Sequence, residues 1–303
     1  MKIGVVGLGS MGYGMAMSCL RAGHEVYGFD LSDLAVSKFV DAGGLAGDIA
    51  ACAPELDALV VVVLNAAQLE AVLFGEEGDA SNGGAAASMA TGAVILACAT
   101  VPPDVARRME ARAKASGRHY LDAPISGGSV KAEAGQLGVM ASGRPAAFDA
   151  ARPVLDACAE TVFELGDEAG AGSAMKAVNQ LLAGVHIAAM AEALTFGMTQ
   201  GIKPEAFFDV ISRCAGSSWM LENRTPHIIA GDYTPHSQVN IWPKDLGIVL
   251  AAASRADFEA PLTETTLAQF RRAQEMGLGQ EDDAAVAKVY AKQAGLALPG
   301  GAS

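Results

Sequence analysis

Short apolar runs alternate with helical stretches through the first half of the chain. The apolar runs are KIGVVG from Lys2, EVYGFD from Glu25, DALVVVVLN from Asp57, AVILACAT from Ala93, HYLDAPIS from His119, QLGVMASG from Gln136 and TVFELG from Thr161. Uninterrupted runs such as residues 59–64 are apolar on both faces, which is typical of parallel strands covered by helices on both sides. We therefore expect an α/β fold with a doubly wound, mostly parallel sheet.

The pattern changes after Gly166. Strand signals stop there, and long helical patterns rich in Ala, Leu and Met continue to the end of the chain. The segment GDEAGAG supplies glycines for a change of chain direction, and Ser173 is expected to cap the next helix. We predict a sheet domain over residues 1–165 and an all-helical domain over residues 166–303, the second providing substrate and oligomer contacts.

Charge and cysteine usage narrow the partners and the compartment. A formal net charge of −13 makes binding to nucleic-acid phosphates or anionic lipid unfavourable, so we expect neither nucleic acid nor membrane as a partner. The 5 cysteines are scattered and never spaced as CxxC, which favours reduced thiols in the cytoplasm and implies no metal site. Residues 173–200 approach the length of a membrane span, but Lys176 and Glu192 interrupt them, so we expect a buried helix.

A glycine-rich motif, GLGSMG, follows the first apolar run and opens a helical pattern. In GxGxxG spacing, Gly7 permits a tight turn, Gly9 lets the backbone approach a pyrophosphate, and Gly12 allows close packing of helix and strand. The spacing predicts a Rossmann-type dinucleotide site, although a tight turn without a ligand has the same spacing. The predicted cofactor-binding residues of this loop are Gly7, Leu8, Gly9, Ser10, Met11 and Gly12.

An acid at the end of the next strand indicates which cofactor binds. Asp30 lies about 20 residues after the glycine loop, where a carboxylate can accept hydrogen bonds from a ribose hydroxyl. A 2′-phosphate would meet Asp30 and Asp33 without a nearby arginine, so repulsion favours NAD over NADP. The alternative is an ordinary acid in a turn.

A second motif, DAPISGG from Asp122, follows a later strand at the carboxyl edge of the expected sheet, where open α/β folds bind their ligands. Ser126, Gly127 and Gly128 offer a hydroxyl group and unhindered backbone amides, which suit a small carboxylate. A glycine-rich turn without a ligand is the alternative.

One lysine, Lys176, lies in an otherwise apolar helical segment. With Ser173 as the cap it falls in the first turn, and Asn179 and Gln180 project from the same face. Partial desolvation and the helix dipole should lower the pKa of its amine from about 10.4 toward ~7–8, which suits proton transfer. Such a lysine can take a hydroxyl proton while hydride leaves the same carbon for a nicotinamide. A lysine that extends its stem to reach water is the alternative.

Together with KDLG at Lys244, these motifs resemble the β-hydroxyacid dehydrogenase family, which is also called 3-hydroxyisobutyrate dehydrogenase-like, over nearly the whole chain. The resemblance implies a Rossmann NAD(P)-binding domain and a helical domain, joined by a long helix that also builds subunit contacts. It implies the following roles: Lys176 as acid/base, Ser126 to Gly128 on the substrate carboxylate, Asn179 and Gln180 orienting the substrate, Lys244 near the nicotinamide, Thr100 beside the cofactor, and Leu64 with Asn65 on its adenosine side. The chain departs from many members at Gln180, where they carry Asn.

Finer features, such as SSWMLENRTPHIIAGDYTPHS from Ser217, resemble the L-threonate dehydrogenase branch, which oxidises four-carbon sugar acids. Trp219 could then contact the substrate, although a core tryptophan is the alternative. We expect an NAD-dependent oxidoreductase that forms a homo-oligomer, dimer or tetramer. A 3-hydroxyisobutyrate dehydrogenase or a tartronate-semialdehyde reductase is the nearest alternative, and a non-catalytic dinucleotide-binding regulatory module is the non-enzyme one. The acidic run from Glu281 to Asp283 is expected to be a solvated helix start.

Overall fold

A computed structural model describes residues 1–75 and 83–299. The chain divides into two compact units, Met1–Lys176 and Ala177–Ser303, each of which is described by itself. The division falls beyond the boundary expected from the sequence, after Lys176 instead of after residue 165, inside a helix that continues from one unit into the other. The boundary near Gly166 therefore stays a prediction based on the end of the strand pattern.

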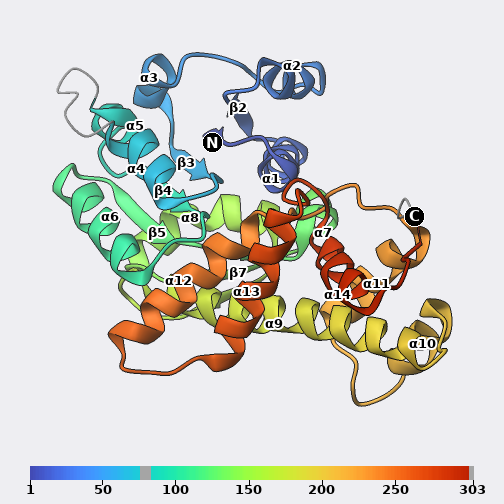
Figure 1. Cartoon of the computed structure of the whole chain (residues 1–303). Coiled ribbons are helices and arrows are strands. Elements are labelled where there is room, and N and C mark those ends of the chain that lie inside the picture. The colour runs from blue at the N-terminus through green and yellow to red at the C-terminus, as the bar shows by residue number, and fades with distance from the viewer. Residues whose placement is uncertain (76–82, 300–303) are drawn as a thin grey trace. The chain divides into compact units, whose positions relative to one another are not determined.

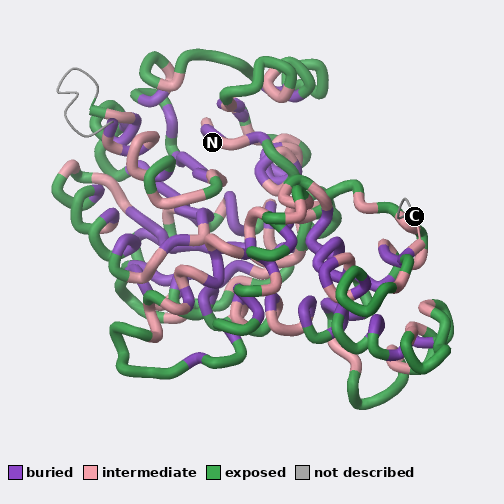
Figure 2. Tube along the Cα trace, viewed as in Figure 1, coloured by how far each residue is buried: buried purple, intermediate pink, exposed green. Residues whose placement is uncertain are grey.

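The first unit is built on a parallel sheet of five strands in the order β2-β1-β3-β4-β5. Its strands are β1 (Lys2–Val6), β2 (Glu25–Phe29), β3 (Ala58–Val61), β4 (Val94–Ala97) and β5 (His119–Asp122). Every residue of β3 and β4 is buried, as Figure 2 shows for the centre of the sheet. Strands buried on both faces need helices on both faces, which confirms the predicted doubly wound sheet.

Two apolar clusters cover the two faces of this sheet, because successive strand residues point to opposite sides. Val60 packs into one cluster, and its neighbours Leu59 and Val61 pack into the other. The first cluster includes residues of α1 (Ser10–Arg21), α2 (Asp33–Asp41), α7 (Gly128–Ala134) and α8 (Pro145–Cys158). The second includes residues of η1 (Ala53–Glu55), α4 (Ala66–Phe74), α5 (Gly84–Ser88) and α6 (Pro103–Ala115), with α3 (Ile49–Cys52) packed beside it (Figure 1).

The last strands of this unit form a second sheet of three strands, β6 (Ile125–Ser126), β7 (Leu137–Ala141) and β8 (Ala159–Glu164). β6 runs antiparallel to β7, and β7 runs parallel to β8. Pro124 has no backbone amide to donate, so β5 cannot continue as a paired strand through it. The apolar pattern predicted these strands but did not distinguish the second sheet from the first.

Apart from one isolated bridge between Gln238 and Asp282, the regular elements among the described residues of the second unit are all helices, as the sequence predicts. Its helices are the greater part of α9 (Ala171–Thr199), then α10 (Pro204–Ile211), α11 (Trp219–Ala230), α12 (Ile241–Arg255), α13 (Pro261–Glu275), η2 (Asp283–Val286) and α14 (Ala287–Ala294). The core of this unit includes Ile187, Leu194 and Trp242, and the Trp242 ring stacks on Phe270 with 5.4 Å between ring centroids.

Two local expectations are wrong. Helix α9 begins at Ala171, so Ser173 lies inside its first turn instead of capping it, and Lys176 lies in the second turn. Gly170, with φ 108°, turns the chain into the helix in a conformation that favours glycine. The acidic run is not a solvated helix start, because Asp282 and Asp283 are completely buried.

Helix α9 is long and apolar enough to meet the criteria for a membrane span by length and composition alone. In the protein, however, 44% of its most apolar window is buried. Ile187, Ala191 and Leu194 belong to the core of the second unit, so this helix packs as a core helix.

Candidate active site

The glycine loop joins β1 to α1 in a shape that suits a pyrophosphate. Gly7 has a φ of 90°, and a side chain there would meet the Val62 carbonyl oxygen at 2.5 Å. A side chain at Gly12 would collide with the carbonyl oxygen of Gly7. At Gly9, the residue before the first turn of α1, a side chain would meet nothing within 4 Å. The loop is therefore packed on its inner side and open at Gly9, as approach of a phosphate to the backbone requires.

The remaining loop residues and Asp30 extend this cradle. Leu8 is buried, whereas Ser10 begins α1 and is exposed. Asp30 follows β2, and its Oδ2 atom accepts a hydrogen bond of 2.6 Å from the Leu8 amide. Its other oxygen accepts one of 2.8 Å from the Ser32 amide. The acid expected at the ribose is thus held directly against the glycine loop.

Three further residues with an expected cofactor role lie after the carboxyl ends of β3 and β4. Leu64 is 64% exposed, and Asn65 caps α4 by accepting a hydrogen bond from the Gln68 amide. Thr100 follows β4 and is partly buried. Because the carboxyl ends of parallel strands lie along one edge of a sheet, these residues share the edge of the glycine loop.

The substrate motif follows β5 at the same edge. Ser126 ends β6, and Gly127 and Gly128 have φ angles of 136° and 74°, so both adopt conformations that favour glycine. A side chain at Gly128 would meet nothing within 4 Å, so the turn is open on the side to which a side chain would point.

Lys176 lies beside this motif. Its Nζ atom donates a hydrogen bond of 2.9 Å to the Ile125 carbonyl oxygen, one residue before Ser126, and the side chain is buried with 9% exposure. The lysine therefore does not extend into water, and the structure brings it together with the segment expected to hold the substrate carboxylate.

Asp122, to which the sequence assigns no role in the site, holds the start of α9. Its carboxylate accepts hydrogen bonds from Gly170 and Ser173, at the beginning of the helix that carries Lys176. Burial raises the pKa of this carboxyl group, and the hydrogen bonds from Ser173, Gly170 and Ser142 oppose the increase. The sequence signal was an acid at the end of a strand, directly before the Ser-Gly-Gly turn.

Other predicted site residues belong to the second unit. The Gln180 amide donates a hydrogen bond of 2.6 Å to Asp245, and Gln180 in turn accepts one of 2.9 Å from Asn179. Lys244 lies 2.7 Å from the other oxygen of Asp245. Asp245, which the sequence motif contained without a role, therefore links Gln180 to Lys244.

Trp219 also belongs to the second unit. It begins α11 and is 58% exposed. Within the described residues it has no hydrogen bond to Gln180 or Lys244. The alternative of a core tryptophan is thus wrong for Trp219, whereas Trp242 does lie in the core.

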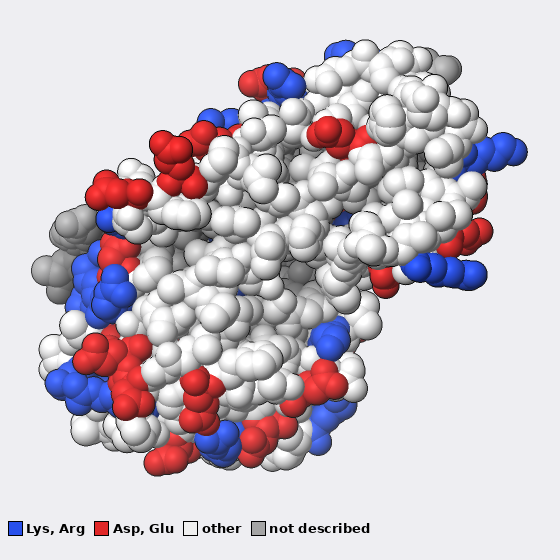
Figure 3. All heavy atoms as spheres, turned by 90° about the horizontal axis from the view of Figure 1, so that it is seen from below, with Lys and Arg blue, Asp and Glu red and all other residues white. Residues whose placement is uncertain are grey.

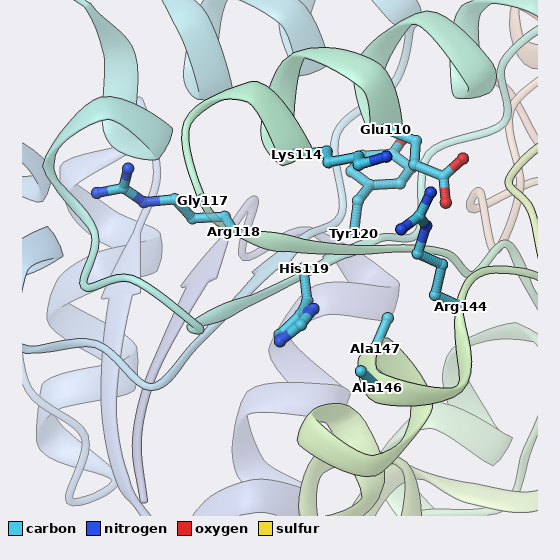
Figure 4. A pocket seen from close by; sticks show the side chains of 9 residues that line it. All are labelled: Glu110, Lys114, Gly117, Arg118, His119, Tyr120, Arg144, Ala146 and Ala147. Atoms are coloured by element: carbon cyan, nitrogen blue, oxygen red, sulfur yellow. The ribbon is translucent and has the colours of Figure 1, made fainter.

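A cavity of about 280 Å³ lies at the opposite end of β5, where this strand starts at His119. Figure 4 shows the Arg144 guanidinium extending toward Glu110, and Arg118 pointing away from both. None of the predicted site residues lines this cavity, because they follow the carboxyl ends of the strands.

The described residues contain no group of three or more His, Cys, Asp or Glu side chains that could hold a metal ion. On the face in Figure 3, acidic and basic side chains are mixed.

Two family models match consecutive parts of the chain. The model described as the NAD binding domain of 6-phosphogluconate dehydrogenase matches residues 2–166. The model described as NAD-binding of NADP-dependent 3-hydroxyisobutyrate dehydrogenase matches residues 170–290.

Individual relatives match nearly end to end. An L-threonate dehydrogenase of Cupriavidus necator is 47% identical, with 99% of this chain and 98% of the relative covered. An L-threonate dehydrogenase of Escherichia coli K12 is 44% identical, covering 99% and 97%. The crystal structure of a 3-hydroxyisobutyrate dehydrogenase from Salmonella typhimurium superimposes with a TM-score of 0.89 at 45% identity, covering 95% of this chain and 99% of that one. Relatives this similar over almost their whole length decide the classification: the chain belongs to the β-hydroxyacid dehydrogenase family of oxidoreductases, which includes 3-hydroxyisobutyrate dehydrogenase.

Proposed function

We propose that this chain catalyses the NAD-dependent oxidation of a small hydroxy acid, most directly L-threonate to 2-dehydro-L-erythronate, or of a related four-carbon sugar acid. The observation that carries the chemistry is the buried Lys176 amine, 2.9 Å from the Ile125 carbonyl oxygen and next to the Ser-Gly-Gly turn. The substrate is inferred from relatives named L-threonate dehydrogenase that are 47% and 44% identical.

The dinucleotide would be held along the carboxyl edge of the parallel sheet. Backbone amides of the glycine loop, open at Gly9, would bind its pyrophosphate, and Asp30 would accept hydrogen bonds from a ribose. Leu64 and Asn65 would line its adenosine side, and Thr100 and Lys244 would contact the nicotinamide side. When bound, NAD supplies the acceptor for the hydride.

Lys176 would act as the general base in oxidation. Its neutral amine takes the proton of the substrate hydroxyl as the C–H bond of the same carbon releases hydride, so the alcohol loses two electrons and becomes a carbonyl. The Ile125 carbonyl accepts one N–H of the amine and so holds the nitrogen beside the Ser-Gly-Gly turn. The protonated lysine then releases its proton to water.

Polar groups on either side of Lys176 in the sequence would orient the acid. The Ser126 hydroxyl and the amides of Gly127 and Gly128 suit its carboxylate. Asn179 and Gln180 follow the lysine on α9 at helical spacing and would bond the substrate hydroxyls, with Trp219 as a further contact.

Replacing the lysine tests this proposal. We expect Lys176→Ala to lower kcat by about 10²- to 10⁴-fold, since the proton acceptor is lost, while NADH still binds. Steady-state rates with L-threonate, together with NADH fluorescence titrations, measure the two effects. Lys2→Ala is the matched control, because Lys2 starts β1 at the amino edge and pairs with Glu55. Near-wild-type turnover of Lys176→Ala at neutral pH would contradict the mechanism.

A second candidate is the oxidation of 3-hydroxyisobutyrate or the reduction of tartronate semialdehyde with the same residues. It is favoured by the solved Salmonella structure, which is named 3-hydroxyisobutyrate dehydrogenase and is 45% identical to this chain. Relative kcat/KM values for L-threonate, 3-hydroxyisobutyrate and tartronate semialdehyde distinguish the candidates. A higher value for 3-hydroxyisobutyrate or tartronate semialdehyde than for L-threonate would replace the first proposal.

We further propose that the enzyme is cytoplasmic and a homo-oligomer. The cysteines are free, including Cys19 and Cys158, whose sulfur atoms lie 3.5 Å apart without a disulfide bond. This favours a reducing compartment. The oligomer is supported by an exposed apolar stripe on α9 that contains Met175, Leu182 and Phe196, with exposed fractions of 44%, 50% and 65%.

A further inference from the structure

Asp122 is a buried carboxylate that has no ion pair among the described residues of the chain. Its side chain is completely buried, at the point where β5 ends. A charged oxygen pair in this position needs hydrogen-bond donors in place of water. All the donors that it finds come from Ser142 and from the beginning of α9.

The bonds to the helix are short and numerous. Oδ2 accepts from the Gly170 amide at 2.8 Å and from the Ser173 amide at 2.9 Å, and Oδ1 accepts from the Ser173 hydroxyl at 2.7 Å. Ser142 adds to the arrangement, because its hydroxyl oxygen accepts from the Gly172 amide at 2.9 Å and lies 3.3 Å from Oδ2. Together these two side chains bond three backbone amides that would otherwise have no partner inside the helix.

Asp122 thereby performs the task of a helix cap from a distant part of the chain. The first turn of α9 contains no acidic residue of its own, although a negative charge is favourable at the positive end of a helix. Gly172 lets the helix approach closely, because a side chain there would collide with the Met140 carbonyl oxygen. The start of α9 is therefore fixed against β5 and β7.

The segment that begins at Asp122 also binds Lys176. Asp122 binds the first turn of α9, and three residues later the Ile125 carbonyl oxygen accepts a hydrogen bond of 2.9 Å from the Lys176 Nζ atom. A shift of α9 along its axis would break both sets of bonds. We propose that Asp122 is a positioning residue for the reaction, which acts through α9 to set the place of the Lys176 amine beside the Ser-Gly-Gly turn.

This inference rests on the proposed role of Lys176, and its test separates the two. For Asp122→Asn, one oxygen becomes an amide NH₂ that faces donors, so the helix start loses an acceptor. Since a misplacement of about 1 Å can cost 10²-fold, we expect kcat to fall about 10- to 100-fold. The KM for NAD should change less than about twofold, because the glycine loop is untouched. The kcat–pH profile of the wild type should contain one limb that is absent in Lys176→Ala and therefore reports the Lys176 amine. In Asp122→Asn this limb should shift along the pH axis, because the surroundings of the amine change.

Activity is measured well below the unfolding temperature, with circular dichroism to confirm folding. If Asp122→Asn does not fold, Ser173→Ala serves instead, because it removes only the hydroxyl donor to Oδ1. For this variant we expect a smaller loss of kcat, about 2- to 5-fold, with the same shift of the pH profile. A fall in kcat without a shift of the profile, or no fall at all, in a folded variant overturns the positioning role. Retained turnover of Lys176→Ala would instead overturn the proposed function.

Discussion

Asp30 affects both the choice of cofactor and the shape of the glycine loop. Its two oxygens accept hydrogen bonds from the amides of Leu8 and Ser32 at 2.6 and 2.8 Å, so the carboxylate is fixed in place. Each carboxylate oxygen can accept a second hydrogen bond, which leaves capacity for ribose hydroxyls. A 2′-phosphate would instead bring negative charge against this carboxylate.

Removing the Asp30 carboxylate should therefore change two quantities. In Asp30→Ala we expect the ratio of kcat/KM for NAD to that for NADP to fall about tenfold or more, since a hydrogen-bond acceptor and a repulsive charge are both lost. The KM for NAD should rise, because the Leu8 amide loses its partner. Steady-state kinetics with both cofactors measures this. Asp41→Ala, at the exposed end of α2, is the control. A wild type that prefers NADP would show this interpretation to be wrong.

Among the elements, η2 begins with a completely buried acid, Asp283. Asp283 accepts hydrogen bonds from the Arg224 Nε atom at 2.5 Å and from the Trp242 indole at 2.9 Å. Burial raises the pKa of Asp283, and the neighbouring guanidinium of Arg224 opposes the increase. The three residues come from η2, α11 and α12, so one carboxylate links three elements.

Breaking this link should destabilise the helical unit. In Asp283→Ala, the buried Arg224 loses its hydrogen-bonded carboxylate and keeps only Asp282 at 4.0 Å and its neighbour Asn223. Removing one member of a buried pair costs about 3–5 kcal/mol. We expect unfolding in urea to have a lower midpoint in this variant. Tryptophan fluorescence monitors the unfolding, because the Trp242 indole donates to Asp283. Asp209→Ala, an exposed acid on α10, should change the free energy of unfolding by less than about 0.5 kcal/mol. Equal midpoints for Asp283→Ala and wild type would contradict a structural role of this link.

These elements also show which features a sequence can predict. The strands and the glycine loop follow from patterns within about ten residues, because alternation, apolar runs and glycine spacing are local. The burial of Asp283 depends on Arg224 and Trp242, which lie 59 and 41 residues away in the sequence. Asp122 likewise meets Ser173 across 51 residues. The sequence therefore predicts the acids at 281–283 to be solvated and gives Asp122 no role, because the donors that bind both carboxylates are distant in the sequence.

For the whole molecule, a net charge of −13 and an apolar stripe act in opposite directions on self-association. Met175, Leu182, Ala189 and Phe196 follow one another at seven-residue spacing on α9, so they lie along one face of the helix over about 32 Å. Burying this stripe against a second copy removes apolar surface from water. Bringing two acidic copies together costs electrostatic energy, which salt screens over a Debye length of about 10 Å at 0.1 M.

We therefore expect an oligomer whose dissociation constant decreases as salt increases. Light scattering coupled to size-exclusion chromatography should give a mass above the 30.8 kDa of one chain for the wild type. The double variant Leu182→Glu/Phe196→Glu should have a mass closer to that of one chain, because it places charge in the stripe. Phe258→Glu, which changes another residue with 64% exposure outside the stripe, should leave the mass unchanged. If wild type remains a single chain at micromolar concentration in 0.5 M salt, the stripe does not bind a second copy; if the stripe variant keeps the wild-type mass, the contact between copies lies elsewhere.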